Sequence, residues 1–196
     1  MVGLFITRQI IQENFVLRCT MGKVGIVGLI CCGVSLTLIV TSTALPYWIR
    51  KQDDGGVSSS GLWMFCWKGN DQEEANCQEM IPVSEYYLAV RALVLMGLFV
   101  VASANVFGFV SIFMIRQRKN ITLFAGVLSI LSGICMLTGA IVFAGRTSYL
   151  AKGVFVQYHV GFSLSIVAGV VGIAAGILFI LAGLSEEIQN SSSLLH

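Results

Sequence analysis

Four long apolar stretches, separated by short polar segments, dominate the pattern of this chain. They run approximately over residues 24–47, 88–115, 121–144 and 159–184. A helix needs roughly 20 predominantly apolar residues to cross ~30 Å of hydrocarbon, and each stretch reaches that length. The segment RQRKN between the second and third stretches is long enough only for a tight antiparallel connection. The pattern predicts an integral membrane protein, mainly α, built as a left-handed bundle of four transmembrane helices.

Composition agrees with a membrane protein and leaves no room for a soluble domain. Of 196 residues, 56% are hydrophobic and 11% are charged, far from the balance of an ordinary soluble domain. We expect an amino-terminal segment over 1–23, a four-span domain over 24–184 and a tail over 185–196. The extracellular loops are then 48–87 and 145–158.

Charge sets the expected orientation, because basic residues near span ends stay in the cytoplasm. Such residues precede the first span and fill the loop between spans two and three: Arg8, Arg18, Lys23, Arg116, Arg118 and Lys119. The loop at 48–87 carries an excess of acids instead: Asp53, Asp54, Asp71, Glu73, Glu74, Glu79 and Glu85. We therefore expect a multi-pass plasma-membrane protein with both termini cytoplasmic and a net negative first extracellular loop.

The first 20 residues admit two interpretations. Ile6, Ile10 and Leu17 could form one face of a helix lying in the membrane interface, or the segment could be a loosely ordered tail. Cys19 sits at the predicted cytoplasmic boundary, where reversible palmitoylation is possible and an unmodified thiol is the alternative. The role of this segment stays open.

The stretch GLWMFCWKGNDQEEANC, residues 61–77, differs from the rest of the chain because it combines aromatic residues, two cysteines and acids. Turn residues over 69–71 separate two extended segments, so a hairpin would bring Cys66 and Cys77 onto neighbouring strands. Both lie in an oxidising compartment, which favours a disulfide. A zinc site is the competing interpretation, but no histidine or further cysteine lies nearby to complete four ligands.

A wider constellation surrounds these cysteines. Trp48 follows the first span, Gly61, Leu62 and Trp63 precede Cys66, and Arg91 opens the second span. In this order, with four matching spans, the constellation resembles the claudin superfamily, which includes claudins, epithelial membrane proteins, peripheral myelin protein, the lens fibre membrane intrinsic protein and channel gamma subunits. The resemblance covers about residues 22–184. It implies a first extracellular loop folded into a small antiparallel sheet, with Cys66 and Cys77 as the family's disulfide.

Elementary chemistry also suggests a role for each of these residues. Trp48 and Trp63 are amphipathic, which suits the membrane interface at the outer ends of the helices. Gly61 allows either a close backbone approach or a positive φ. Arg91 is a charge at the edge of the apolar layer, so it must snorkel outward or find carbonyls or acids. The resemblance implies that it braces the sheet against the bundle.

Two classes of function remain. The first is an adhesion or junction protein, which binds itself or related proteins in cis and trans through the two loops, including an apolar cluster at Val154, Phe155 and Val156. The second is an auxiliary subunit that clasps a channel or receptor, with Gly172 and Gly176 as a small-xxx-small contact face. Packing inside the bundle is the other interpretation of that glycine pair.

Features of the chain divide between these classes. The segment from Trp48 to Trp63 is shorter than in most junction-forming claudins and is nearer in length to the lens and epithelial membrane protein branch. The extended amino end and the terminus SSSLLH also depart from claudins, and these two features favour the second class. The paired cysteines and the apolar second loop favour the first.

Other functions find little support in the sequence. There is no paired carboxylate within the spans, no Ser-His or Cys-His pairing and no phosphate-binding glycine loop, so we expect no enzyme and no cofactor. No metal site is expected either. The chain offers no sizeable basic soluble surface for nucleic acid. Asn105, polar at mid-span, is expected to hydrogen-bond within the bundle.

Overall fold

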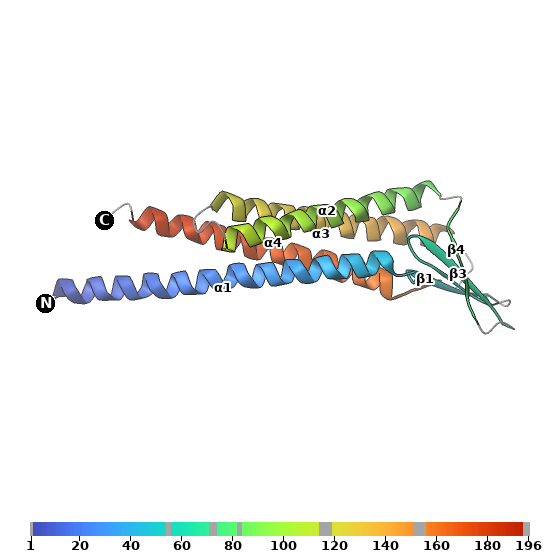
Figure 1. Cartoon of the computed structure of the whole chain (residues 1–196), viewed down its shortest axis with the longest axis horizontal. Coiled ribbons are helices and arrows are strands. Elements are labelled where there is room, and N and C mark those ends of the chain that lie inside the picture. The colour runs from blue at the N-terminus through green and yellow to red at the C-terminus, as the bar shows by residue number, and fades with distance from the viewer. Residues whose placement is uncertain are drawn as a thin grey trace.

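Four long helices form the bundle in the computed structural model, which describes residues 2–53, 56–70, 74–81, 84–113, 119–150 and 156–193. Side chains are described throughout these ranges except at 2–22, 53, 119, 148–150, 156 and 186–193. The helices are α1 (Val2–Ala44), α2 (Glu85–Phe113), α3 (Lys119–Leu150) and α4 (Val160–Ser193) (Figure 1). Their stretches long and apolar enough to cross a membrane are Lys23–Ala44, Glu85–Phe113, Asn120–Thr147 and Val160–Ser185. The fold class predicted from the sequence is confirmed.

α1 is longer than predicted at its amino end. It runs without a break from Val2 and stays collinear with the first span, so the initial segment is neither a separate interfacial helix nor a loose tail (Figure 1). No proline precedes Pro46 to interrupt it. The helix then ends at Ala44, because Pro46 disfavours helical geometry at the residue before it. The side chain of Cys19 lies outside the described residues, so its palmitoylation stays a prediction.

Glycines set the distance between α3 and α4. They recur at intervals of seven residues on both helices, and a Cβ added at one would collide with the backbone or a side chain of the other: Gly126, Gly133, Gly169, Gly176 and Gly183. At Gly133, for example, the added Cβ would lie 2.6 Å from the carbonyl oxygen of Gly169. A seven-residue repeat keeps one face of each helix against its neighbour and favours the left-handed supercoil that we expected.

The pair Gly172 and Gly176 therefore belongs to the interior of the bundle, and its assignment as a surface for a partner helix is wrong. A Cβ at Gly176 would lie 2.6 Å from the carbonyl oxygen of Gly126, and one at Gly172 would lie 3.0 Å from Ser35 Oγ. Both glycines are buried against α1 and α3. The structure instead agrees with the other interpretation of this spacing, which is close packing within the bundle.

Serine hydroxyls join the helices where the glycines bring them together. Ser35 Oγ donates to the carbonyl oxygen of Ala168 at 2.8 Å, and Ser129 Oγ donates to that of Gly172 at 2.7 Å. Ser132 Oγ similarly donates to the carbonyl oxygen of Gly97 at 2.7 Å. These bonds connect α1 with α4, α3 with α4, and α3 with α2, so each hydroxyl is satisfied inside an apolar layer.

A five-stranded antiparallel sheet projects from one end of the bundle (Figure 1). Its strands are β1 (Ile49–Asp53), β2 (Gly56–Ser60), β3 (Met64–Gly69), β4 (Asn76–Glu79) and β5 (Val156–Tyr158), in the order β4-β3-β2-β1-β5. The first four strands come from the first predicted loop, residues 48–87. β5 comes from the second loop and pairs with β1, so the two loops form one sheet rather than one sheet and a separate connection.

Candidate functional site

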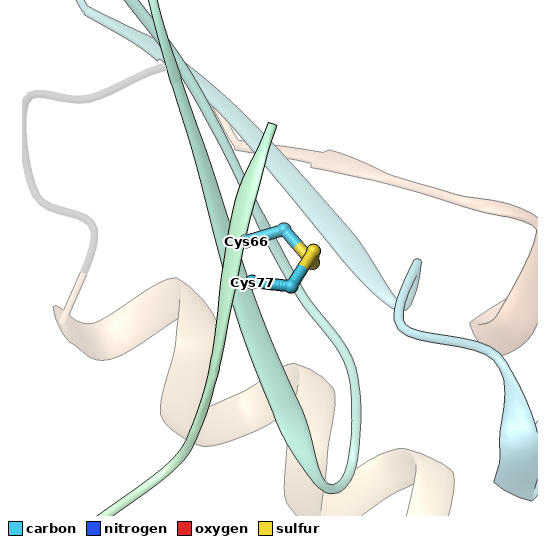
Figure 2. The surroundings of a disulfide bond; sticks show 2 residues. All are labelled: Cys66 and Cys77. Atoms are coloured by element: carbon cyan, nitrogen blue, oxygen red, sulfur yellow. A yellow bond between two sulfur atoms is a disulfide. The ribbon is translucent and has the colours of Figure 1, made fainter. Parts of the chain in front are cut away.

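The disulfide joins the two strands at one edge of the sheet. Cys66 in β3 and Cys77 in β4 are direct cross-strand partners, with their Cα atoms 4.0 Å apart and a bond between their sulfurs (Figure 2). Cys66 is only 3% exposed, whereas Cys77 is exposed at the sheet edge. Within the described ranges no three His, Cys, Asp or Glu side chains gather to hold a metal ion, so the zinc interpretation has no ligand set there.

Trp48 joins the sheet to the bundle from inside. Its side chain is completely buried, Nε1 donates to the carbonyl oxygen of Ser42 at 2.8 Å, and its ring meets Phe143 edge-on at 5.1 Å. Its backbone NH donates to the carbonyl of Ser60, and its carbonyl accepts from the NH of His159, both at 2.9 Å. The ring lies against the outer ends of the helices, as we expected, but Phe143 and the helix ends enclose it, so it does not face outward.

Gly61 permits a close crossing between the turn that follows β2 and the end of α1. A Cβ there would lie 2.5 Å from Pro46 Cα and 2.7 Å from the carbonyl oxygen of Leu45. Its φ is not positive, so of the two predicted roles the close approach is the relevant one. Leu62, next in the chain, is completely buried and belongs to the same apolar core as Trp48.

Arg91 contacts the sheet from the first turns of α2. Its Nε donates to the carbonyl oxygen of Leu62 at 2.8 Å, and its guanidinium carbon lies 4.8 Å from the ring centre of Trp63. Trp63 is 39% exposed, so its ring, unlike that of Trp48, is not enclosed by the protein, and its place at the membrane interface stays a prediction. The carbonyl and the ring together compensate a charge held at the edge of the apolar layer.

A cleft of about 180 Å³ lies between the sheet and the outer ends of α2 and α3. The sheet contributes Lys51, Ser58, Ser60 and Phe65 to its lining, and the helices contribute Tyr87 and Thr147. The sheet residues are cross-strand neighbours, since Lys51 pairs with Ser58 and Ser60 with Phe65. Sequence reasoning missed this cleft, because its walls come from segments far apart in the chain.

β3 carries exposed aromatic side chains on the same face of the sheet. Phe65 is 42% exposed and Trp67 is 44% exposed. Because they lie two residues apart on one strand, their side chains point to the same face of the sheet. Phe65 lines the cleft, so this is the face that borders the cleft. Of the apolar cluster predicted in the second loop, Val154 and Phe155 lie outside the described residues, and Val156 is described only by its backbone pairing with Lys51.

Asn105, which is partly buried at mid-span, forms a polar contact between α1 and α2. Its Nδ2 donates to the carbonyl oxygen of Val101 at 3.0 Å, and to the carbonyl oxygen and Sγ of Cys32, both at 3.2 Å. The expectation of hydrogen bonds within the bundle is confirmed. The side-chain oxygen Oδ1 accepts no hydrogen bond from the described residues. A Cβ at Gly33 would meet only this oxygen, at 3.8 Å, so open space adjoins it.

Comparison with known proteins agrees with these features. The model of the PMP-22/EMP/MP20/Claudin family matches residues 22–185, which include all four spans, both loops that form the sheet and every anchor described above. No individual curated protein matches the chain. The family match extends over most of the sequence and its bounds coincide with those of the bundle and sheet. The chain therefore belongs to the PMP-22/EMP/MP20/Claudin family of four-span membrane proteins.

Proposed function

We propose that this protein acts without catalysis in cell–cell adhesion or junction formation at the plasma membrane, with both termini cytoplasmic. The exposed aromatic pair on β3, Phe65 and Trp67, is the observation that carries the proposal. Aromatic side chains are enriched among the residues that dominate binding energy at protein interfaces, and exposed apolar clusters mark contact surfaces. The pair lies on a sheet outside the predicted spans, where lipid does not account for its exposure.

The rigidity of the sheet supports the same proposal. The disulfide, the buried Trp48 and the Arg91 contact fix the strands relative to the bundle. A surface held in this way loses little conformational freedom when it binds. The expected partners are a second copy of the chain or a related family member, in the same membrane and across cells. The segment Val154, Phe155 and Val156 is the second proposed contact.

Expression in cells that lack junctions tests this function. We expect enrichment at contacts only where both neighbouring cells express the protein, and we expect Trp67→Ala or Phe155→Ala to reduce that enrichment at unchanged surface level. Lys68→Ala is a matched control, because Lys68 is exposed on the opposite face of β3. Surface biotinylation separates lost contact from lost delivery. Diffuse wild-type signal at contacts, or normal enrichment in both aromatic variants, contradicts the proposal.

A second candidate, an auxiliary subunit of a channel or receptor, is favoured by the Asn105 oxygen. An amide oxygen without a donor is costly in hydrocarbon, and a partner helix bringing a hydroxyl or amide NH would satisfy it. Gly33 leaves the space for such a helix to approach. This groove between α1 and α2 replaces Gly172 and Gly176 as the proposed helix-docking face.

Gly33→Leu tests the groove, because the new side chain would fill the open space beside Asn105 without displacing the bundle. We expect a channel or receptor that co-purifies in stoichiometric amount with the wild type to be lost from this variant. Gly145→Leu is the control, since a Cβ there meets nothing within 4 Å. Equal recovery of the partner with both variants contradicts docking at the groove.

A further inference from the structure

We propose that the cleft between the sheet and the helix ends binds a carboxylated sugar ring, the acidic end group of a glycan. The proposal goes beyond the adhesive role and does not depend on it. It rests on donors in the cleft that have no partner, on the aromatic wall beside them, and on the size of the space.

Three polar groups of the lining have no hydrogen-bond or ionic partner in the described part of the chain: Lys51 Nζ, Ser58 Oγ and Thr147 Oγ1. Thr147 lines the cleft although only 5% of the residue is exposed, and its hydroxyl is not among the enclosed polar atoms that lack a partner, so its oxygen is open to the cleft. A hydroxyl that faces a cleft without a protein partner can bond to water or to a bound molecule. Because the ammonium of Lys51 has no partner, the bound molecule should carry a negative charge.

The remaining walls match a ring that carries hydroxyls. Phe65 presents a partly exposed aromatic face, against which the C–H face of a pyranose can pack. Beside it, its cross-strand neighbour Ser60 shares a hydrogen bond of 3.0 Å with Tyr87 between their hydroxyls, and each oxygen retains capacity for a further bond. The cleft thus offers an aromatic face and hydroxyl groups, which match the C–H face and the hydroxyls of a sugar ring.

The size of the cleft and the charge of its lining further limit the class of ligand that it can bind. A volume of about 180 Å³ is well below the ~300 Å³ at which drug-sized pockets begin, so one ring fits and a peptide does not. The lining contains a single cation, Lys51, flanked by neutral hydroxyls. A carboxylate, with one negative charge, matches this set better than a phosphate dianion, which is typically held by several cationic or backbone donors.

The test uses the purified full chain in phosphatidylcholine nanodiscs and two probes, methyl glucuronide and methyl glucoside. These differ only in a carboxylate against a hydroxymethyl group. We expect saturable binding of the glucuronide with Kd of about 1 mM, and binding of the glucoside weakened about tenfold or more. Saturation-transfer NMR titration gives both values. Comparable affinity for the two sugars, or no saturable binding of the glucuronide by about 20 mM, overturns the proposal.

Two variants locate the binding in the cleft. Lys51→Gln should weaken glucuronide binding about tenfold, and Thr147→Val, which keeps the shape and removes the hydroxyl, should weaken it about threefold. Lys68→Gln, which removes a cation on the other face of the sheet, should leave it unchanged. An intact disulfide and an unchanged circular dichroism spectrum establish that each variant is folded. Unaltered affinity in Lys51→Gln, or an equal loss in Lys68→Gln, overturns the site.

The same assay identifies where the sugar comes from, since glycolipids and glycoproteins share this chemistry. Nanodiscs that contain a sialylated glycolipid present the acidic ring from the protein's own membrane. If glucuronide binding is competed there, the source is the surrounding bilayer. If it is not, the source is a soluble or opposing glycan. Both results uphold the cleft as the site.

Discussion

The bundle and the sheet are held together in opposite ways. In the bundle, many large apolar side chains face outward to lipid, including Phe99 and Ile141, which are 70% and 71% exposed in the isolated chain. Its cohesion comes instead from glycines and serines that let backbones meet. The sheet depends on a few tethers: one disulfide, one buried tryptophan and one arginine. In this molecule the smallest residues determine helix packing, whereas large or covalent groups fix the strands.

A methyl group added at the α3–α4 contact should produce the largest effect. In Gly176→Ala the new Cβ would lie 2.5 Å from Ile130 Cγ1 and 2.6 Å from the carbonyl oxygen of Gly126. Because a backbone atom limits relaxation, we expect a cost at or above the ~1–3 kcal/mol usual for overpacking. Thermal unfolding in detergent and retention inside the cell measure it. Gly145→Ala should change neither, and a stable, surface-delivered Gly176→Ala protein would contradict the packing described.

Removal of the disulfide should affect the sheet while the bundle persists. Cys66→Ser, Cys77→Ser and the double variant remove the same link, which closes a loop with a sequence separation of 11. We expect each to lose about 2–4 kcal/mol of sheet stability, with helical content unchanged. Limited proteolysis within residues 48–87, measured together with circular dichroism, tests this. If one single variant were protected from protease and the other cleaved, the two cysteines would not act as a pair.

The arginine contact should have a smaller effect. Arg91→Lys keeps the charge but loses the Nε donor to the Leu62 carbonyl, which should cost about 1 kcal/mol. A double-mutant cycle between Arg91→Ala and Trp63→Leu should give a coupling of about 0.5–1 kcal/mol from the cation–π contact. Unfolding of the sheet followed by near-ultraviolet circular dichroism supplies the free energies. If the losses of unfolding free energy from the two substitutions were additive, the contact between Arg91 and Trp63 would not stabilise the sheet.

The smallest expected effect tests which end of the bundle faces the cytoplasm. Two glycosylation sequons begin at Asn120 and Asn190 and lie at the end of the bundle away from the sheet. In the proposed orientation they are cytoplasmic, so Asn120→Gln and Asn190→Gln should leave the apparent mass unchanged. A glycosidase-sensitive band that disappears in either variant would reverse the proposed topology.

Sequence predicts the bundle and the cysteine pair well, for physical reasons. Span length is fixed by bilayer thickness, so the predicted ranges differ from the observed ones by only a few residues. The turn residues between Cys66 and Cys77 indicate a hairpin, and the strands pair with these residues opposite each other. Both inferences depend on local sequence alone.

What sequence could not give depends on contacts between distant segments. Small-xxx-small spacing identifies a close helix contact but not its partner, so the sequence left open whether Gly172 and Gly176 pack inside the bundle or against a partner helix. β1, β2 and β5 are short and mostly polar, without a clear alternation, and none was predicted individually. Trp48 has the chemistry of an interface residue, and only the arrangement of Phe143 and the helix ends shows that it is enclosed. The cleft has no local signature.

The pairing of β5 with β1 also has a mechanical consequence. The first loop joins the sheet to α1 through β1 and to α2 through β4, and β5 leads into α4, so the pairing of β5 lets α4 share a pull on the sheet away from the membrane. The hydrogen bonds of an antiparallel pair lie across the strands, and a load along the strands shears them together instead of opening them one by one. Anchorage of this kind spreads a load on the sheet over more of the bundle than the two ends of the first loop alone would.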